Sequence, residues 1–542
     1  VLIDGRTVYS SLFNGVYWNR IDTLLHDIER IEVIRGPGGS LWGTNAAKGI
    51  VNIVTRSSLD TSGGYLSVGG GDGRYGHGLE GRYGLAGESR GIRFYAKQYE
   101  LDRGTYPDVE EQSAAGVFVA GKTAYDGQTM GQGGFRSDFS LGSETRMTFQ
   151  GDIYRGEEEF ETVTRLPLSA HQDDIDSEGG NLLGRIDHSF NDESSIKLQL
   201  YYDYTAHQNA TFEDRRNIFD IDFQHNLFWT QHELVWGLGY RQTENRTSHD
   251  GGTYTFALDP EERSDSLLSF FIQDEFIFLE EQARFIIGSK YEYNDYTGSE
   301  WQPSMKLLYA PDSRQNFRFS VSRAVVVPSR ALNDAYLDLN SFSSQCEEMG
   351  GESHETLGCI RSINDRDADS TNILSWEGGY RHQLQENWFF DGVLFYDDYR
   401  EANSESELLE SIWGFEGLVQ YHGKPFHGEL SYTYHQGESA PEAGEKDVAG
   451  QIPRHSVKGR IYYSFFEDFD LDVLATYVDG VVDLSSVFKV DLRLAWHPKE
   501  DMELSLKVNN LIGDDHVEGN WDILKANTLE EREFIARLSY RF

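Results

Sequence analysis

Glycines near the start of the chain are the first residues whose types and spacing could support chemistry. Gly36, Gly38 and Gly39 lie between two short apolar stretches, residues 31–34 and 50–54. Glycine-rich turns can cradle a phosphate, but the lysine followed by serine or threonine that completes a phosphate-binding loop is missing at the required spacing. The pattern therefore predicts a chain reversal between two strands rather than a nucleotide site.

The two cysteines are the next candidates. Cys346 and Cys359 lie 13 positions apart in a polar segment. This spacing favours a disulfide in an oxidising compartment over two free thiols. His354 lies between them, yet one histidine and two cysteines match no zinc pattern, so the sequence assigns no metal.

Catalytic patterns are absent from the sequence. It contains neither a Ser-His-Asp order nor a His-Glu-x-x-His motif, and carboxylate pairs are expected by chance because 90 residues are acidic. We therefore expect no enzyme and no cofactor. The formal net charge of −42 also argues against a nucleic-acid partner, which would require a basic surface.

Acidic residues gather in two segments, 156–178 and 325–370, and the second carries nine carboxylates. Such segments disfavour strongly anionic substrates and suit metal ions or cationic complexes slightly better. Calcium binding and plain solvation remain the commoner explanations.

The overall composition indicates what kind of elements must position these residues. Hydrophobic residues make up only 38% of the 542 residues and mean hydropathy is −0.54, yet aromatic residues reach 13%. No run of 18 apolar residues exists, so the sequence predicts no transmembrane helix. A sheet with one apolar face and one polar face would have this composition and could still cross a membrane.

Apolar and polar residues alternate along most of the chain after residue 60. Ile196, Leu198 and Leu200 alternate with polar neighbours, and residues 488–496 and 502–508 repeat the pattern. One such run is typical of any half-buried strand. The length of the series favours something larger, because about 22 runs can be placed between residues 63 and 542.

The links between these runs alternate in length. Short links such as 141–143 and 311–313 alternate with long ones such as 156–178 and 325–370. This is typical of an up-and-down barrel in the bacterial outer membrane. We therefore expect an all-β membrane barrel of about 22 antiparallel transmembrane strands over residues 59–542.

A barrel of this width cannot be filled by its own side chains and would enclose a plug. Residues 1–58 do not alternate and are the candidate for a small α+β plug in the lumen.

Several motifs in this segment resemble the second half of the plug of the TonB-dependent outer-membrane receptor family. They are residues 1–6, 27–37, 42–46 and 51–55. In the barrel, residues 322–329, 508–514 and the terminal aromatic Phe542 resemble that family's marks. The family's plug is about twice as long as residues 1–58, so the resemblance implies a truncated plug without the TonB-contacting box, in a chain that would not couple to TonB as given. No signal peptide opens the chain at Val1 either, which we expect processing or truncation to explain.

The resemblance implies active, TonB-dependent uptake of a scarce metal complex, most commonly a ferric siderophore, across the outer membrane of a Gram-negative bacterium. Cobalamin, haem or another metal or cationic complex are the alternatives, and a passive porin or an adhesin is the alternative class. Some haem receptors carry a ligand histidine in the loop that holds His354, but their Asn-Pro motif is replaced here by residues 371–374. The implied partners are TonB, outer-membrane lipid and lipopolysaccharide, and the protein is expected to be monomeric.

The resemblance also places candidate site residues on the plug. Tyr9, Phe13, Tyr17 and Trp42 are expected to face outward over the lumen, where they would contact substrate or pack against the barrel wall.

Two basic plug residues are candidate contacts with the barrel. Arg35 is expected to pair with a barrel glutamate, because a lumen arginine without a partner is costly. Lys48 would meet an inward carboxylate or, as we favour, remain solvated.

Overall fold

The computed structural model describes residues 1–107, 122–165, 168–209, 212–249, 255–339, 352–354, 358–362, 368–401, 411–439, 449–482, 484–518 and 527–542. Side chains are described for these residues except 162–165, 168–171, 249, 255–256, 336–339, 352–354, 358–362 and 401. The expected disulfide between Cys346 and Cys359 lies outside the described residues.

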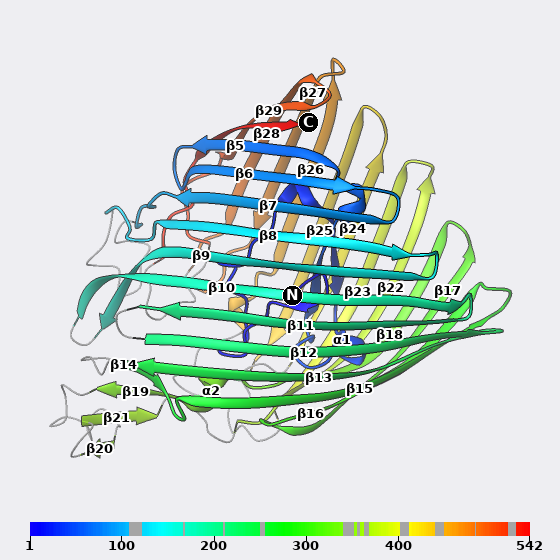
Figure 1. Cartoon of the computed structure of the whole chain (residues 1–542), viewed down its shortest axis with the longest axis horizontal. Helices are drawn as coiled ribbons and strands as arrows, with labels where there is room; N and C mark the ends of the chain where they lie inside the picture. The colour runs from blue at the N-terminus through cyan, green and yellow to red at the C-terminus, as the bar shows by residue number, and fades with distance from the viewer. Residues whose placement is uncertain are drawn as a thin grey trace.

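Twenty-two strands of the described chain form one closed antiparallel barrel, which confirms the predicted fold (Figure 1). The barrel strands are β5 (Gly63–Gly71), β6 (Tyr75–Ala86), β7 (Arg90–Leu101), β8 (Gln128–Leu141), β9 (Thr145–Arg165), β10 (Leu168–Asn191), β11 (Ser194–Gln208), β12 (Phe212–Trp229), β13 (His232–His249), β15 (Glu262–Phe278), β16 (Ala283–Asn294), β17 (Gly298–Asp312), β18 (Gln315–Val326), β22 (Thr371–Gln385), β23 (Trp388–Glu401), β24 (Ser411–His422), β25 (Phe426–Glu438), β26 (His455–Phe465), β27 (Phe469–Val478), β28 (Val487–Lys499), β29 (Met502–Ile512) and β30 (Glu533–Arg541). Closure occurs between β30 and β5, from Ile535 opposite Gly71 to Arg541 opposite Tyr65. No strand edge is left unpaired in the ring, as lipid requires of a spanning sheet.

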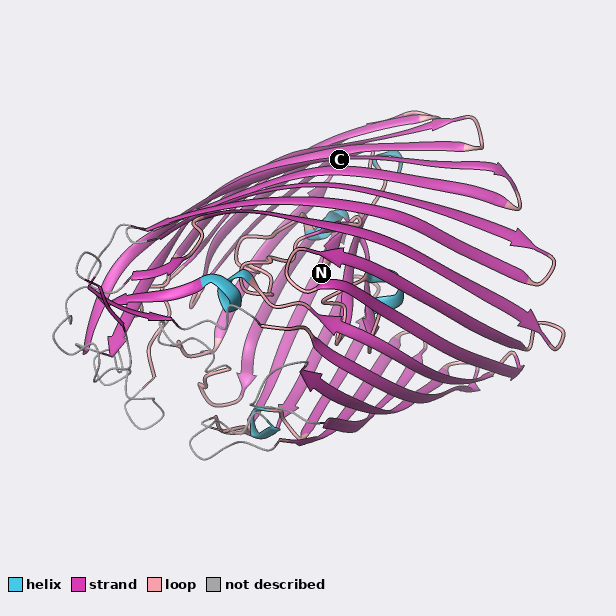
Figure 2. Cartoon of the chain, turned by 90° about the horizontal axis from the view of Figure 1, so that it is seen from below, coloured by secondary structure: helices cyan, strands magenta, loops and turns pink. Residues whose placement is uncertain are grey.

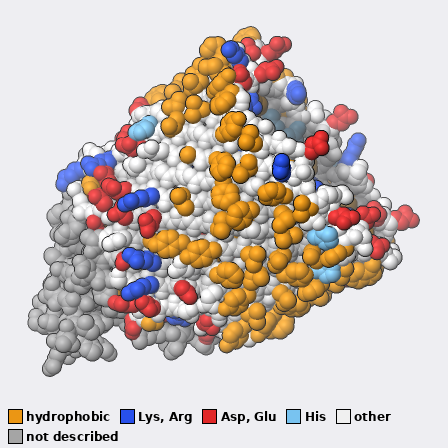
Figure 3. All heavy atoms as spheres, viewed as in Figure 1, with side chains coloured by type: hydrophobic (Ala, Val, Ile, Leu, Met, Phe, Trp, Pro, Cys, Tyr) orange, Lys and Arg blue, Asp and Glu red, His pale blue; other side chains and the backbone are white. Residues whose placement is uncertain are grey.

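The alternation seen in the sequence sorts side chains between lumen and outer face. Along β5, Leu66 and Val68 are each 48% exposed, while Ser67 between them is buried toward the lumen. Figure 3 shows hydrophobic side chains gathered across the outer face, with charged side chains toward both ends. None of the helices among the described residues is long and apolar enough to span a membrane.

Two ends of the barrel can be told apart by their connections. We call the end with turns such as 142–144, 192–193 and 313–314 the short-turn end, and the other the long-loop end. At the long-loop end a second sheet has the order β14-β19-β21-β20. Its elements and the nearby helices are β14 (Thr255–Leu258), α2 (Arg330–Asp334), β19 (Ala335–Leu339), β20 (Glu352–His354), β21 (Gly358–Ser362) and η6 (Ala449–Gln451).

The expected long loop at 156–178 is wrong. β9 continues to Arg165 and β10 begins at Leu168, and the two strands stay paired, for example Glu157 with Asp176. Because acidic residues interrupt the alternation of apolar and polar residues here, a hydropathy pattern does not predict this pairing. Once a hairpin leaves the membrane, ladder hydrogen bonds can continue with charged residues on both faces.

Residues 1–60 lie inside the ring of barrel strands (Figures 1 and 2). Their elements are β1 (Leu2–Ile3), β2 (Arg6–Thr7), η1 (Leu25–Asp27), β3 (Ile28–Arg35), α1 (Gly39–Trp42), β4 (Gly49–Thr55) and η2 (Ser58–Asp60). The four strands form a separate sheet in the order β2-β1-β4-β3, with β1 parallel to β4 and β3 antiparallel to it. We call this part the plug.

Candidate functional site

Two plug loops point toward the long-loop end, the first formed by residues 8–24 and the second by residues 36–48. Both meet the end of β18 and the segment that joins it to α2. The backbone N–H of Asn45 donates to the Val325 carbonyl at 2.8 Å, and the Val327 N–H donates to Asn45 Oδ1 at 3.0 Å. Asn14 Nδ2 donates to the Val327 carbonyl at 2.7 Å. The joining segment therefore holds both loops through backbone groups.

The first loop also supplies hydrogen-bond acceptors for the first N–H groups of α2. Arg330 N–H donates to the Ser11 carbonyl at 2.9 Å, and Ala331 N–H donates to the Leu12 carbonyl at 2.8 Å. Leu12 packs with buried Leu258 and Ala335. Because the first N–H groups of a helix lack partners within it, the plug supplies acceptors that α2 would otherwise find in water.

Gly43 lets the second loop approach the barrel wall closely. Its φ is +86°, and a Cβ placed there would lie 2.1 Å from Glu292 Oε1 on β16. Glu292 is 2% exposed and its Oε2 accepts the Thr44 N–H at 2.6 Å. Glycine is needed here both for the left-handed backbone and for the space.

The four aromatic residues predicted from the sequence separate into two pairs. Tyr9 and Trp42 line a cavity of about 670 Å³ between the plug and strands β10 to β16. Phe13 and Tyr17 instead contact each other, with ring centres 4.6 Å apart. The structure therefore brings Tyr9 and Trp42, which lie 33 positions apart in the chain, to one space.

Tyr17 lies in a polar, enclosed setting. Its ring centre is 4.7 Å from that of His207 on β11 and 4.5 Å from the Arg20 guanidinium carbon. Burial raises the pKa of Tyr17 to about 12, and burial also raises the pKa of Tyr9 to about 12. Both phenols are neutral near pH 7, so they offer ring faces and hydroxyl groups to a ligand.

The two predicted basic residues are placed differently. Arg35 Nη1 lies 2.5 Å from Glu416 Oε2 on β24, although the arginine side chain is 61% exposed. Lys48 is exposed, with its ammonium nitrogen 5.8 Å from the centre of the Tyr399 ring on β23. Lys48 thus lies over a ring face, and its charge also acts on the Asp397 carboxylate on the same strand.

Sequence reasoning missed a buried charged cluster that joins the plug to β8 near the short-turn end. Arg136 Nη1 lies 3.5 Å from Asp4 Oδ2, and its Nε donates to Asp138 at 2.9 Å. Asp138 also accepts the Ser58 N–H at 2.6 Å, and Asp4 accepts the Thr55 N–H at 2.9 Å. These charges are paired and hydrogen-bonded, as burial demands.

A second buried contact lies beside it. Asp27 is 2% exposed, and its two carboxylate oxygens lie 3.6 Å from Arg82 Nε and 3.3 Å from Arg93 Nε. The signal in the sequence was the presence of Asp4 directly after three apolar residues and of Asp27 at the start of the second plug motif. Without the barrel partners, however, either aspartate could equally have been a turn residue.

No group of three or more metal-ligating side chains occurs among the residues that the structure describes.

Family models match both parts of the chain. The plug-domain model of the TonB-dependent receptors matches residues 1–50, and a model described as TonB-dependent receptor-like β-barrel matches residues 120–511.

Curated relatives include a ferric enterobactin receptor of Pseudomonas aeruginosa, 24% identical over 94% of this chain and 73% of that protein. The vitamin B12 transporter BtuB of Photobacterium profundum is 22% identical over 100% of this chain and 84% of that protein. The BtuB of Vibrio vulnificus is 41% identical, but only over 70 residues, which are 13% of this chain and 11% of that transporter.

Solved structures share the fold. The siderophore receptor PirA from Acinetobacter baumannii gives a TM-score of 0.75 at 15% identity, covering 100% of this chain and 90% of that one. The FrpB iron transporter from Neisseria meningitidis gives 0.74 at 12% identity, covering 95% and 88%.

Proposed function

Because the chain belongs to the TonB-dependent receptor family, we propose that it takes up a ferric siderophore actively across the outer membrane of a Gram-negative bacterium. The observation that carries this proposal is the relationship to a ferric enterobactin receptor along 94% of the chain. Siderophore receptors also recur among the solved structures with this fold.

We assign different roles to two parts of the chain, the plug (residues 1–58) and the barrel (residues 59–542). In this proposal the long-loop end faces the outside and the short-turn end faces the periplasm. Substrate binds over the plug loops, and TonB supplies the force that moves the plug. The protein acts as a monomer in contact with lipid and lipopolysaccharide.

Tyr9 and Trp42 are the plug residues that we assign to substrate contact, because both line the lumen cavity. Phe13 and Tyr17 support the loop that carries Tyr9 by packing on each other. Arg35 and Lys48 are assigned to plug–barrel contact with β24 and β23.

Uptake of cobalamin is the second candidate, since two curated relatives are vitamin B12 transporters. Haem and other metal or cationic complexes have no comparable support among these relatives. A passive porin is disfavoured because the plug sheet occupies the lumen (Figure 2).

Growth of a strain from which the whole gene is deleted tests the proposal. Under iron limitation, with ferric enterobactin and other siderophores supplied one at a time, we expect the deletion to abolish growth on at least one siderophore, and the gene in trans to restore it. Normal growth on every iron source combined with loss of cobalamin use would replace the proposal with the second candidate.

A further inference from the structure

Two neighbouring rows of side chains on the outer face of the barrel are interrupted by glycine. Residues that pair directly in antiparallel strands point to the same face, so each row is continuous across the wall. One row consists of Leu307, Phe319, Gly378, Leu394 and Phe415, and the other of Tyr309, Phe317, Tyr380 and Gly392.

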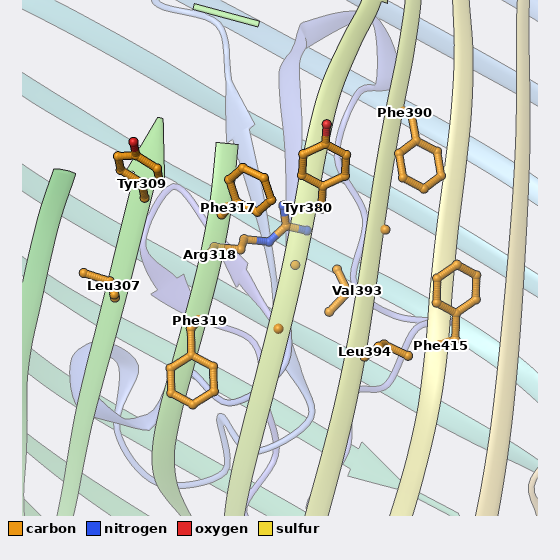
Figure 4. A pocket seen from close by; sticks show the side chains of 13 residues that line it. Leu307, Tyr309, Phe317, Arg318, Phe319, Tyr380, Phe390, Val393, Leu394 and Phe415 are labelled. Atoms are coloured by element: carbon orange, nitrogen blue, oxygen red, sulfur yellow. The ribbon is translucent and has the colours of Figure 1, made fainter. Parts of the chain in front are cut away.

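A hollow of about 470 Å³ lies between these rows, lined by residues of β17, β18, β22, β23 and β24, and the missing side chain of Gly378 leaves it open. A Cβ on Gly378 would meet nothing within 4 Å. Its row neighbours Phe319 and Leu394 are 51% and 61% exposed and form the rim. Figure 4 shows the rings of Tyr309, Phe317 and Tyr380 toward one end, and Phe319, Leu394 and Phe415 toward the other. We call this hollow the outer groove.

One end of the outer groove is polar. Tyr380 Oη lies 3.0 Å from His382 Nδ1 and donates to Gln315 Oε1 at 3.0 Å. Arg314 is exposed in the turn just before β18, at the same end. Asp312, at the end of β17, accepts a hydrogen bond from Gln315 Nε2 at 2.8 Å. This end therefore carries hydroxyl, imidazole, guanidinium and carboxylate groups, whose mixed charge is complementary to a zwitterionic headgroup that holds a phosphate ester and an ammonium group.

The groove lies in the half of the membrane nearer the short turns. Phe317 and Phe319 follow the first residue of β18 by two and four positions, which is roughly 7 and 13 Å along a strand. The hydrocarbon core of a bilayer is about 30 Å thick, so both rings lie within its nearer half.

We propose that the outer groove binds one acyl chain of a phospholipid from the leaflet on the short-turn side, with the headgroup phosphate at the Tyr380, His382 and Arg314 end. The hollow has the size of a small-molecule site, roughly 300 to 1,000 Å³, whereas a stable protein partner would need a much larger complementary face. The lining is apolar, faces lipid and ends at the headgroup level in hydroxyl, imidazole, guanidinium and carboxylate groups, which suit a phosphoethanolamine headgroup. This site is independent of the transported substrate.

Photolabelling tests the proposal on the full chain in phosphatidylethanolamine vesicles. A trace of phosphatidylethanolamine with a diazirine in its acyl chain is activated, and labelled peptides are mapped. We compare the native protein with Gly378→Leu, which fills the groove, and with Gly184→Leu. Gly184 on β10 also has nothing within 4 Å of its Cβ, and it lies between outward-facing Leu182 and Ile186, away from the groove.

In the native protein we expect labelling to concentrate on peptides from β18, β22 and β23. Each acyl-chain methylene in apolar contact with the groove changes the fraction of grooves that hold a lipid several-fold. Gly378→Leu should therefore reduce this labelling about tenfold, while Gly184→Leu should leave it unchanged. Heat-modifiable migration on gels verifies that each barrel has folded.

If the strands around the native barrel are labelled uniformly, the proposal is overturned without reference to any variant. Equal labelling of Gly378→Leu and native protein would overturn it too. Stronger labelling of the groove by a diazirine derivative of lipid A would overturn the assigned leaflet, and protection of the groove by a second copy or another protein would overturn the assigned occupant.

Discussion

At the scale of single residues, the plug is held by glycines and asparagines as much as by charges. Gly43 and Gly36 both have positive φ, and a Cβ on Gly36 would lie 1.9 Å from Glu377 Oε1. Barrel glutamates therefore approach the plug backbone where only glycine leaves room. Asn45, also in the left-handed region, uses its side chain to accept a backbone N–H from the barrel.

Replacing Gly43 by alanine should loosen the second plug loop. The new Cβ displaces the Glu292 carboxylate, so the Thr44 N–H loses its acceptor, at a cost of about 1–3 kcal/mol. Hydrogen exchange of residues 39–46 should accelerate. Gly142→Ala is the matched control, because Gly142 has a similar φ of +71° with nothing within 4 Å of its Cβ. Unchanged exchange in Gly43→Ala would contradict the role of this contact.

Replacing Trp42 by alanine should lower affinity for a bound ferric siderophore about tenfold, as truncation of a buried aromatic contact commonly does. Tyr9→Ala should act in the same direction. Fluorescence or calorimetric titration with ferric enterobactin measures the change. Trp18→Ala is the control, since Trp18 is 61% exposed and is not among the residues that line the cavity. Equal loss in the Trp18 variant would contradict the assignment.

At the scale of elements, the plug is attached at both ends. Near the short-turn end Asp4 and Asp27 tie it to β6, β7 and β8 by buried ion pairs. Near the long-loop end its loops are tied to the end of β18 and the start of α2 by backbone hydrogen bonds. A movement of the whole plug out of the lumen has to break both attachments.

Arg136→Ala should accelerate hydrogen exchange in β1 and β4 far more than Arg35→Ala does. Arg136 and its partner Asp4 are 7% and 4% exposed, so removing the arginine leaves a buried charge unpaired at a cost of about 3–5 kcal/mol. The exposed Arg35 pair is screened by water and is worth about 1 kcal/mol or less. Hydrogen exchange of residues 1–7 and 49–55 reports the difference. Similar exchange in the two variants would show that burial does not decide the strength of this attachment.

At the scale of the whole molecule, the barrel and the plug form separate sheets. The ring closes from β30 to β5, and none of the four plug strands pairs with a barrel strand. Contacts between plug and barrel are made by side chains and loops.

A chain lacking residues 1–58 should still form the barrel, because every ladder bond of the ring remains. It should migrate as a heat-modifiable species and give large, steady conductance in planar bilayers. The chain of 542 residues, measured in parallel, should conduct far less. A shortened chain that fails to show heat-modifiable migration would mean that the plug contributes to barrel closure.

The sequence by itself determined the barrel and the plug strands. Alternation and turn chemistry are local properties, so they predicted about 22 strands. They also predicted plug strands at 31–34 and 50–54, where β3 and β4 run Ile28–Arg35 and Gly49–Thr55. The same reliance on hydropathy failed at 156–178, where charged residues continue a paired hairpin beyond the membrane.

Only the tertiary structure decided which side chains meet across the lumen. Tyr9 and Trp42 share a cavity, while Phe13 and Tyr17 do not line it, although the sequence placed all four together. Asp4 forms an ion pair with Arg136, which lies far from it in the sequence. Such contacts depend on how the plug is rotated and how deep it sits in the barrel. These are set by the sum of many contacts between distant residues, which no local pattern encodes.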